Sequence, residues 1–302
     1  MLHPIQWCAG FIISFVALVF LLPIHQQAVF TYHLSHFQYK LTLLLIAAPS
    51  LIVWFVAFWS YSQLLKYAKS LGHNHEGESF HQIAIGLAWL AWSLPIGAIL
   101  SRLLALGDGS SSFMHVSLII ISNYIDLILP LVAFINISIG VKILFNSSKF
   151  EINNTITDLI NYILLFIGLV YCLVILKTFN LNSLSSSHNP YHLAGWLLII
   201  SLLIPYIYGW SLGVKSAYWL NSYSNHISGA IYKRALKIFS LGLTTIIIGF
   251  VIIQYISSTY PTYGRLIFNI HLVINVFVRI IVGIGFVAIA YGASKLKKIE
   301  EV

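Results

Sequence analysis

The chain is poor in charge. Of its 302 residues, 8% are Asp, Glu, Lys or Arg, whereas a soluble domain carries about 25%. A water-soluble fold of this length would need far more polar surface than these residues supply. Asp and Glu together number 8, and most of them fall in expected loops, which leaves little material for paired-carboxylate catalysis. The scarcity of charge therefore excludes a soluble globular protein.

Cysteine is also scarce, with 2 residues in the chain. Cys8 and Cys172 lie in or beside apolar runs, so no disulfide framework is indicated. The sequence contains no G-x-S-x-G, no H-E-x-x-H, no P-loop and no convincing pairing of a Cys nucleophile with His. We therefore expect a protein that is not an enzyme and that holds no cofactor.

Apolar residues are abundant, at 59% of the chain. A helix needs about 20 apolar residues to cross a bilayer. Runs of this kind predict an all-α integral membrane protein with eight transmembrane helices, at about 9–28, 41–65, 82–104, 114–144, 156–178, 193–218, 236–257 and 265–294. Prolines inside four of these runs should kink the helices: Pro49, Pro95, Pro130 and Pro205.

The distribution of Lys and Arg predicts the orientation of these spans. On one side of the membrane the expected loops and span ends carry Lys66, Lys69, Lys142, Lys149, Lys233, Arg234, Lys237, Lys295, Lys297 and Lys298. On the other side they carry Lys40, Arg102, Lys177 and Arg265. Because cytoplasmic loops are enriched in positive charge, both termini are expected in the cytoplasm. The net charge of +8 then reflects topology and favours anionic lipids, not nucleic acid, as partners.

The two halves of the chain resemble each other when the sequence is shifted by 152 residues without a gap. The matched residues include His36 with His188, Tyr39 with Tyr191, Asn123 with Asn275, Phe134 with Phe286, and Gly140 with Gly292. This pattern predicts a tandem duplication of a four-helix unit, with repeats at 1–151 and 152–302. Since four spans is an even number, the repeats should be parallel, related by an axis along the membrane normal.

Two opposite charges lie within these apolar runs. Asp126 follows Asn123 by three residues and Arg279 follows Asn275 by four, so each charge shares a helix face with its asparagine. Both charges fall near mid-bilayer, where an unpaired charge costs at least about 2.5–3.5 kcal/mol. We therefore expect Asp126 and Arg279 to pair across the repeat interface. The pair is either a structural clasp or a site that couples to a proton, ion or solute.

Histidines near these charges admit further interpretations. His271, Asn275 and Arg279 recur at every fourth position, and His115 precedes Asp126 on the other span. Such histidines either relay protons or contact lipid headgroups and backbone. Haem ligation by His115 and His271 is disfavoured, because the two positions differ in depth by about one turn.

The segment HNHEGESFH carries His73, His75, Glu76, Glu78 and His81. Imidazoles with carboxylates suit a transition metal. The corresponding segment of the other half, NHISGAIYK, keeps only His226. A solvated cytoplasmic loop is therefore the preferred interpretation, and no metal is expected.

The tail YGASKLKKIEEV and the stretch SLPIGAIL resemble multi-pass membrane proteins of unknown function from reduced-genome candidate-phylum bacteria of the Saccharibacteria type. The resemblance implies a location in the bacterial cytoplasmic membrane and no particular activity.

The sequence favours a small transporter or permease-like protein whose pathway for a small solute or ion lies between the repeats. Spans 114–144 and 265–294 would line it, Asp126 and Arg279 would gate or couple it, and Asn123 and Asn275 would coordinate. Parallel repeats with polar groups at the midplane are how several transporter families are built. The main alternative is a sensor, scaffold or accessory subunit that binds other membrane proteins. A haem or quinone redox carrier is the third.

Overall fold

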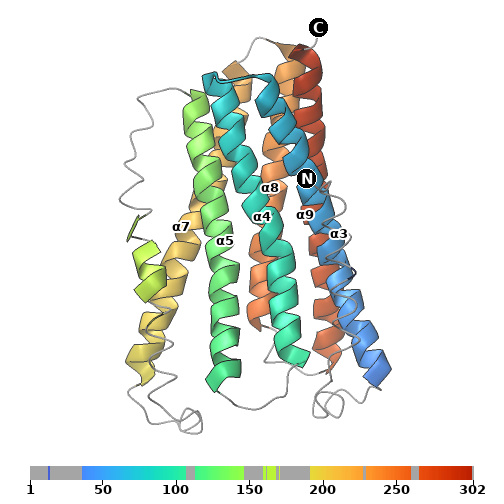
Figure 1. Ribbon diagram of the computed structural model, residues 1–302, viewed down its shortest axis with the longest axis vertical. Helices are drawn as coiled ribbons and strands as arrows, with labels where there is room; N and C mark the ends of the chain where they lie inside the picture. Colours follow the sequence, from blue (N-terminus) through green and yellow to red (C-terminus); the bar gives the residue numbers. More distant parts are fainter. Residues whose placement is uncertain are drawn as a thin grey trace.

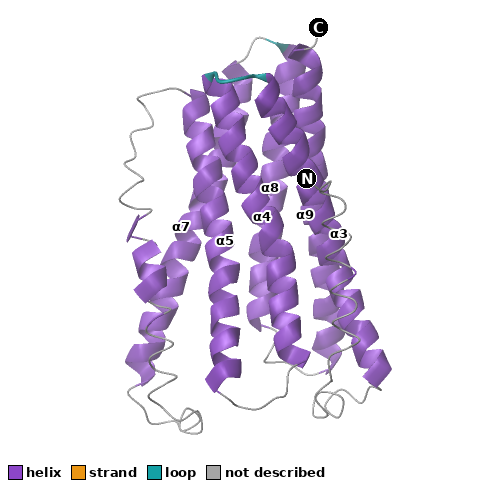
Figure 2. Ribbon diagram, viewed as in Figure 1, coloured by secondary structure: helices purple, strands orange, loops and turns teal. Residues whose placement is uncertain are grey.

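The computed structural model describes residues 36–106, 113–145, 191–226, 229–259 and 265–300, with short pieces at 13, 159–160, 162–167 and 170. Side chains are described over 37, 48–93, 128–145, 203–226, 229–252, 274, 276–296 and the short pieces. The regular structure within these ranges is entirely helical (Figure 2). Its long helices are α3 (His36–Ser70), α4 (His75–Leu106), α5 (Phe113–Phe145), α7 (Tyr191–His226), α8 (Ala230–Thr259) and α9 (Arg265–Glu300).

Local sequence explains the turn between α3 and α4. The Gly72 N–H donates to the Lys69 carbonyl at 3.3 Å, and Gly72 has a φ of 72°, the left-handed conformation that commonly ends a helix at glycine. Asn74 then caps α4, because its Oδ1 accepts the Gly77 N–H at 2.7 Å. Glu76 and Glu78 occupy the first turn of α4, where the helix dipole favours negative charge. The turn therefore holds α3 and α4 antiparallel.

Four of the described helices contain a segment long and apolar enough to cross a membrane. These segments are Ala48–Ser70, Ile128–Phe145, Ala230–Ile252 and Val276–Leu296. The chain is therefore a helical membrane protein by length and composition. Of the expected span 9–28 the structure describes only residue 13, and of 156–178 only 159–160, 162–167 and 170, so the number eight remains a prediction.

The six long helices of the described residues form a closed ring (Figure 1). Around the ring, α3 packs against α4, α4 against α5, α5 against α7, α7 against α8, α8 against α9, and α9 against α3. Helices three steps apart lie opposite each other, so α3 faces α7, α4 faces α8, and α5 faces α9. Toward the end of the bundle where α3 and α7 begin, these two helices lean outward (Figure 1).

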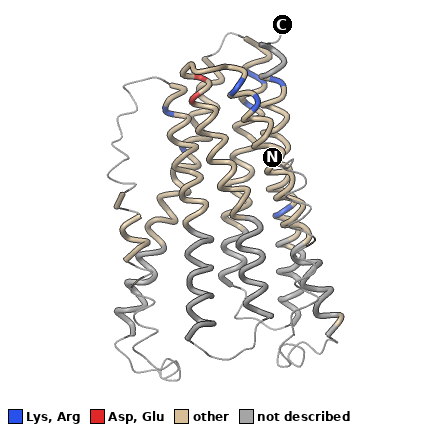
Figure 3. Tube along the Cα trace, viewed as in Figure 1, with Lys and Arg blue, Asp and Glu red and all other residues tan. Residues whose placement is uncertain are grey.

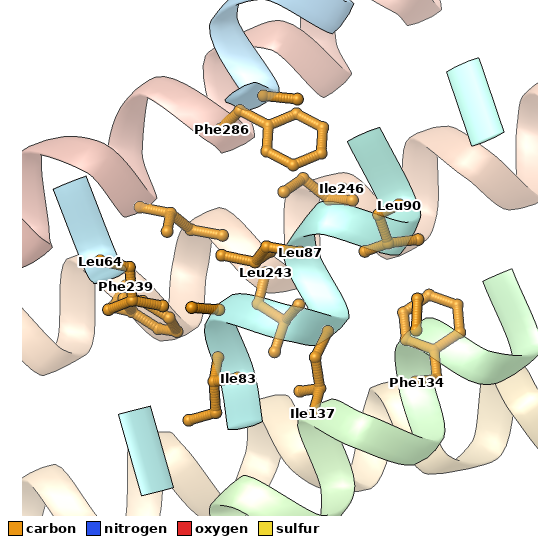
Figure 4. Close-up of a cluster of buried hydrophobic side chains, with 14 of the residues drawn as sticks. Leu64, Ile83, Leu87, Leu90, Phe134, Ile137, Phe239, Leu243, Ile246 and Phe286 are labelled. Atoms are coloured by element: carbon orange, nitrogen blue, oxygen red, sulfur yellow. The ribbon is translucent and has the colours of Figure 1, made fainter. Parts of the chain in front are cut away.

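The centre of the ring is filled with apolar side chains (Figure 4). The cluster includes residues from five of the helices, each at most 1% exposed: Leu64, Ile83, Leu87, Leu90, Phe134, Ile137, Phe239, Leu243, Ile246 and Phe286. Close packing of this kind supplies dispersion contacts that lipid tails would otherwise make. These side chains fill the interior of the half of the bundle nearer the C-terminal ends of α3 and α7. We call these ten residues the central cluster.

The two halves of the ring make matching contacts. A Cβ on Gly86 would lie 2.6 Å from the Ala133 carbonyl oxygen, and one on Gly242 would lie 2.6 Å from that of Gly285. Gly140 approaches the Ser79 carbonyl in the same way as Gly292 approaches that of Ala235. The matched residues are 156 apart between α4 and α8, and 152 apart between α5 and α9.

Contacts of α3 and α7 also follow the larger offset. Gly283 of α9 packs on Val53 of α3, and Leu131 of α5 packs on Gly209 of α7. Gly283 and Leu131 are 152 apart, whereas Gly209 and Val53 are 156 apart. The expectation of one uniform offset of 152 is therefore wrong for the contacts of α3, α4, α7 and α8. The physical reason is that four residues are about one helical turn, so a shift of four preserves which face is buried.

Candidate functional site

The residues expected to form the site lie on two helices that face each other across the ring. Asn123 and Asp126 are in α5, with His115 near its start, whereas His271, Asn275 and Arg279 are in α9. Of these six, only the side chain of Arg279 is described, and it is partly buried. The other five side chains lie outside the described residues, so the expected pairing of Asp126 with Arg279 stays a prediction.

The two charges do not occupy corresponding positions. An offset of 152 makes Val278 the counterpart of Asp126 and Leu127 the counterpart of Arg279. Val278 is 3% exposed, and its carbonyl oxygen would lie 3.7 Å from a Cβ on Gly249 of α8. Arg279 follows it by one residue, which is about 100° around the helix.

The backbone of each charged residue lies at the height of a proline in the neighbouring helix. Gly283 packs on Val53, and four residues earlier in these parallel helices come Arg279 and Pro49. In the other half Leu131 packs on Gly209, and four residues earlier come Leu127 and Pro205. Asp126 is therefore within one residue, about 1.5 Å in height, of Pro205.

The prolines interrupt the helical hydrogen bonds near this height. Each lacks an N–H, so the carbonyl four residues earlier has no helical donor. The freed carbonyls belong to Leu45, Ala91, Asp126 and Ser201, which precede Pro49, Pro95, Pro130 and Pro205. Next to Pro49, the Ser50 hydroxyl is buried and makes no hydrogen bond within the described residues. The ring thus carries polar backbone and hydroxyl groups about 10 Å from the level of Phe286 in the central cluster.

Two pairs of helices, α4 with α5 and α8 with α9, approach each other backbone to backbone. A Cβ on Gly140 would lie 2.6 Å from the Ser79 carbonyl oxygen, and the Ser79 hydroxyl donates to the Gly140 carbonyl at 2.6 Å. In the other half, the Ser240 hydroxyl donates to the Ala217 carbonyl at 2.7 Å, which joins α8 to α7. Small residues that permit such close approach are the usual means of packing helices in membranes.

The two junctions between the halves rest instead on side chains. At the α5–α7 junction, Gly209 meets the Leu131 side chain and Gly213 meets the Phe134 ring. The Phe134 ring also lies 5.0 Å from that of Trp210. At the α9–α3 junction, a Cβ on Gly283 would meet only Val53 Cγ2, at 3.3 Å. The closest backbone approaches in the ring therefore join α4 to α5 and α8 to α9, and we call these the two tight pairs.

Charged residues gather at the end of the bundle where α9 ends (Figure 3). This end carries Lys69 in the last turn of α3, Lys142 in the last turn of α5, and Glu76 and Glu78 in the first turn of α4. Nearby, the Lys295 ammonium lies 5.4 Å from the centre of the Tyr291 ring. Lys69, Lys142 and Lys295, which the sequence assigns to the cytoplasmic side, thus lie toward one end of the bundle, and the orientation itself stays a prediction.

The segment 73–81 does not gather its ligand-type side chains. No three His, Cys, Asp or Glu residues come together as a metal site among the described residues, which include all of 73–81. His73, His75 and His81 are exposed. Glu76 instead interacts with Tyr223 of α7. Burial raises the pKa of the Tyr223 phenol most, and the negative charge of Glu76 and a hydrogen bond with it raise this pKa further.

Sequence reasoning missed the tyrosines at this end of the bundle. The Tyr67 hydroxyl of α3 donates to the Tyr232 hydroxyl of α8 at 3.5 Å. A sequence signal was present, because Tyr67 and Tyr223 are identical at the offset of 156, as are Pro49 with Pro205 and Trp54 with Trp210.

Comparison of the chain with protein-family models, with curated proteins and with solved structures found no match in any of the three. The functional argument therefore depends on the residues and their arrangement.

Proposed function

We propose that the protein is a small transporter or permease-like protein of the bacterial cytoplasmic membrane, with a pathway for a small solute or ion between its two halves. The observation that carries the proposal is that the two tight pairs, α4 with α5 and α8 with α9, make matching backbone contacts on opposite sides of the ring. Rigid-body rocking of one repeat against the other is how many transporters alternate access. Each tight pair would move as a unit, whereas the side-chain contacts at Gly209 and Gly283 can repack.

The matching contacts of the two halves support a duplication. We propose parallel repeats at 1–151 and 152–302, each of four spans, related by a pseudo-two-fold axis along the membrane normal. Opposite helices in the ring are then counterparts: α3 with α7, α4 with α8, and α5 with α9. The axis runs through the central cluster, where Leu87 and Leu243 are counterparts.

The proposed site lies at the height of the prolines. Interrupted helices near the midplane supply free carbonyls to substrates and coupling ions in transporters of this build. Asp126 would bind a proton or cation, and Arg279 would balance its charge across the pathway. Asn123 and Asn275 would coordinate the bound solute or ion, and His115 and His271 would relay protons from the outer side. In this proposal no covalent chemistry and no cofactor are involved.

Topology gives the first testable prediction. With the charged end of the bundle in the cytoplasm, reporter fusions after Lys69, Phe150 and Val302 are expected to report cytoplasm. Fusions after Ser35 and Ser186 are expected to report the opposite side. Fusions after Lys69 and Phe150 that landed on different sides would contradict the eight-span orientation.

Relative movement of the halves is the second prediction. Glu78 of α4 and Arg234 of α8 are exposed counterparts 156 residues apart. Spin labels on Glu78→Cys and Arg234→Cys, with Cys8 and Cys172 changed to Ser, report the distance between halves in liposomes. We expect two distance populations whose ratio changes with pH or with members of a panel of amino acids, sugars and cations. A control pair within one half, Arg234→Cys with Tyr291→Cys, should keep one distance.

The same measurement separates transport from the alternative of a scaffold or accessory subunit. The closely packed apolar central cluster is the observation that favours a static scaffold. A single unchanged distance for the Glu78–Arg234 pair, under every condition of the panel, would reject the transporter and leave the scaffold.

A further inference from the structure

Two polar contacts cross between the halves at the cytoplasmic end of the bundle. The first joins α3 to α8, which are not neighbours in the ring. The Tyr67 hydroxyl donates to the Tyr232 hydroxyl at 3.5 Å. Tyr67 is fully buried, and its ring packs edge-on against Phe80 of α4, with 4.9 Å between ring centres. The phenol is therefore held in a fixed position facing the other half.

The second contact joins α7 to α4, which are also not neighbours in the ring. Tyr223 of α7 interacts with the Glu76 carboxylate of α4, and the pKa of this phenol is raised by burial and by Glu76. A phenol is protonated at neutral pH, so Tyr223 is the donor toward the carboxylate. The Tyr223 ring is fixed by Phe145 of α5, with 5.1 Å between ring centres.

The two contacts are counterparts of each other. Tyr67 and Tyr223 are 156 residues apart, and so are Glu76 and Tyr232. This is the offset that matches Gly86 to Gly242 between α4 and α8. Each tyrosine lies three residues before the end of its helix, and each partner lies in the first turn of α4 or α8. One tie therefore lies on each side of the axis between the halves.

We propose that these two contacts form a latch that keeps the cytoplasmic end of the bundle closed, directly above the central cluster. Its consequence for transport rests on the proposed function, whereas the closure itself does not. Opening of this end requires both contacts to break.

The test uses the spin-label pair at Glu78 and Arg234 in the full chain. Tyr67→Phe and Tyr223→Phe remove one hydroxyl each and keep both rings packed. Each should raise the ratio of open to closed populations about 3- to 10-fold, the worth of one hydrogen bond. The double variant should change the ratio more than either single variant. Tyr218→Phe, at an exposed tyrosine of α7, is the matched control and should change nothing.

Melting temperature is measured on the same variants. If the wild type and every variant keep one distance, but Tyr223→Phe and Tyr67→Phe still melt lower than Tyr218→Phe, the latch stands and the transporter proposal falls. If the populations and melting temperatures of both variants equal those of Tyr218→Phe, the latch is wrong.

Discussion

Gly140→Ala is expected to destabilise the protein strongly, although it adds a single methyl group. The new Cβ would lie 2.6 Å from Ile83 Cγ1 and 2.6 Å from the Ser79 carbonyl oxygen. Backbone cannot withdraw as a flexible side chain does, so α4 and α5 must separate. Separation also lengthens the bond from the Ser79 hydroxyl to the Gly140 carbonyl. We expect the free energy of unfolding to fall by about 1–3 kcal/mol or more. The measurement is the melting temperature of the purified protein, which should be lower.

Substitutions at other glycines serve as comparisons for this prediction. Gly285→Ala should behave like Gly140→Ala, because its Cβ would lie 2.8 Å from the Gly242 carbonyl oxygen. Gly283→Ala, at the α9–α3 junction, should lower the stability less, since only Val53 Cγ2 must move. Gly229→Ala should lower it little, because its nearest neighbour lies at 3.6 Å. Equal losses of stability at Gly140 and Gly283 would mean that α4 and α5 are packed no more tightly than α9 and α3.

Much of the helical architecture is predictable from composition. The expected spans 82–104, 114–144 and 265–294 fall within α4, α5 and α9, because long apolar runs must form helices to satisfy their backbone in lipid. The order of the helices around the ring is not predictable in this way. Leu51 is 7% exposed and its neighbour Ile52 is 65% exposed, yet the two residues are equally apolar. Lipid-facing and core-facing sides therefore look alike in sequence.

The residues of the candidate site can be chosen from the sequence, whereas their pairing stays a prediction. Asp126 and Arg279 stand out as charges in apolar runs, and their helices α5 and α9 are indeed opposite members of the ring. The offset of 152 was wrong for the contacts of the other helices, because Leu and Ile residues match at shifts of either 152 or 156. Only matches between less common residues, such as Pro49 with Pro205, distinguish the two shifts. The latch tyrosines were missed for the same reason.

Asp126→Asn and Arg279→Gln are each expected to lower the melting temperature substantially. In our proposal the two charges balance each other at the height of Pro49 and Pro205. Removing one partner leaves the other uncompensated in the membrane interior, which typically costs about 3–5 kcal/mol. The measurement is the yield and the melting temperature of the purified variants. Single variants as stable as the wild type would mean that neither charge depends on the other.

Exchanging the two charges separates a structural clasp from a coupling site. The double variant Asp126→Arg with Arg279→Asp restores charge balance, so we expect it to recover much of the stability lost in the single variants. A clasp needs only this balance, and the spin labels at Glu78 and Arg234 should then respond to pH and solutes as in the wild type. A coupling site needs its carboxylate in α5, beside the carbonyl that Pro130 frees and at the height of Pro205. We therefore expect the exchanged protein to be stable while its two halves no longer respond. A stable variant that still responds would leave Asp126 as half of a clasp, and would move the search for the coupling group to the other polar groups at this height.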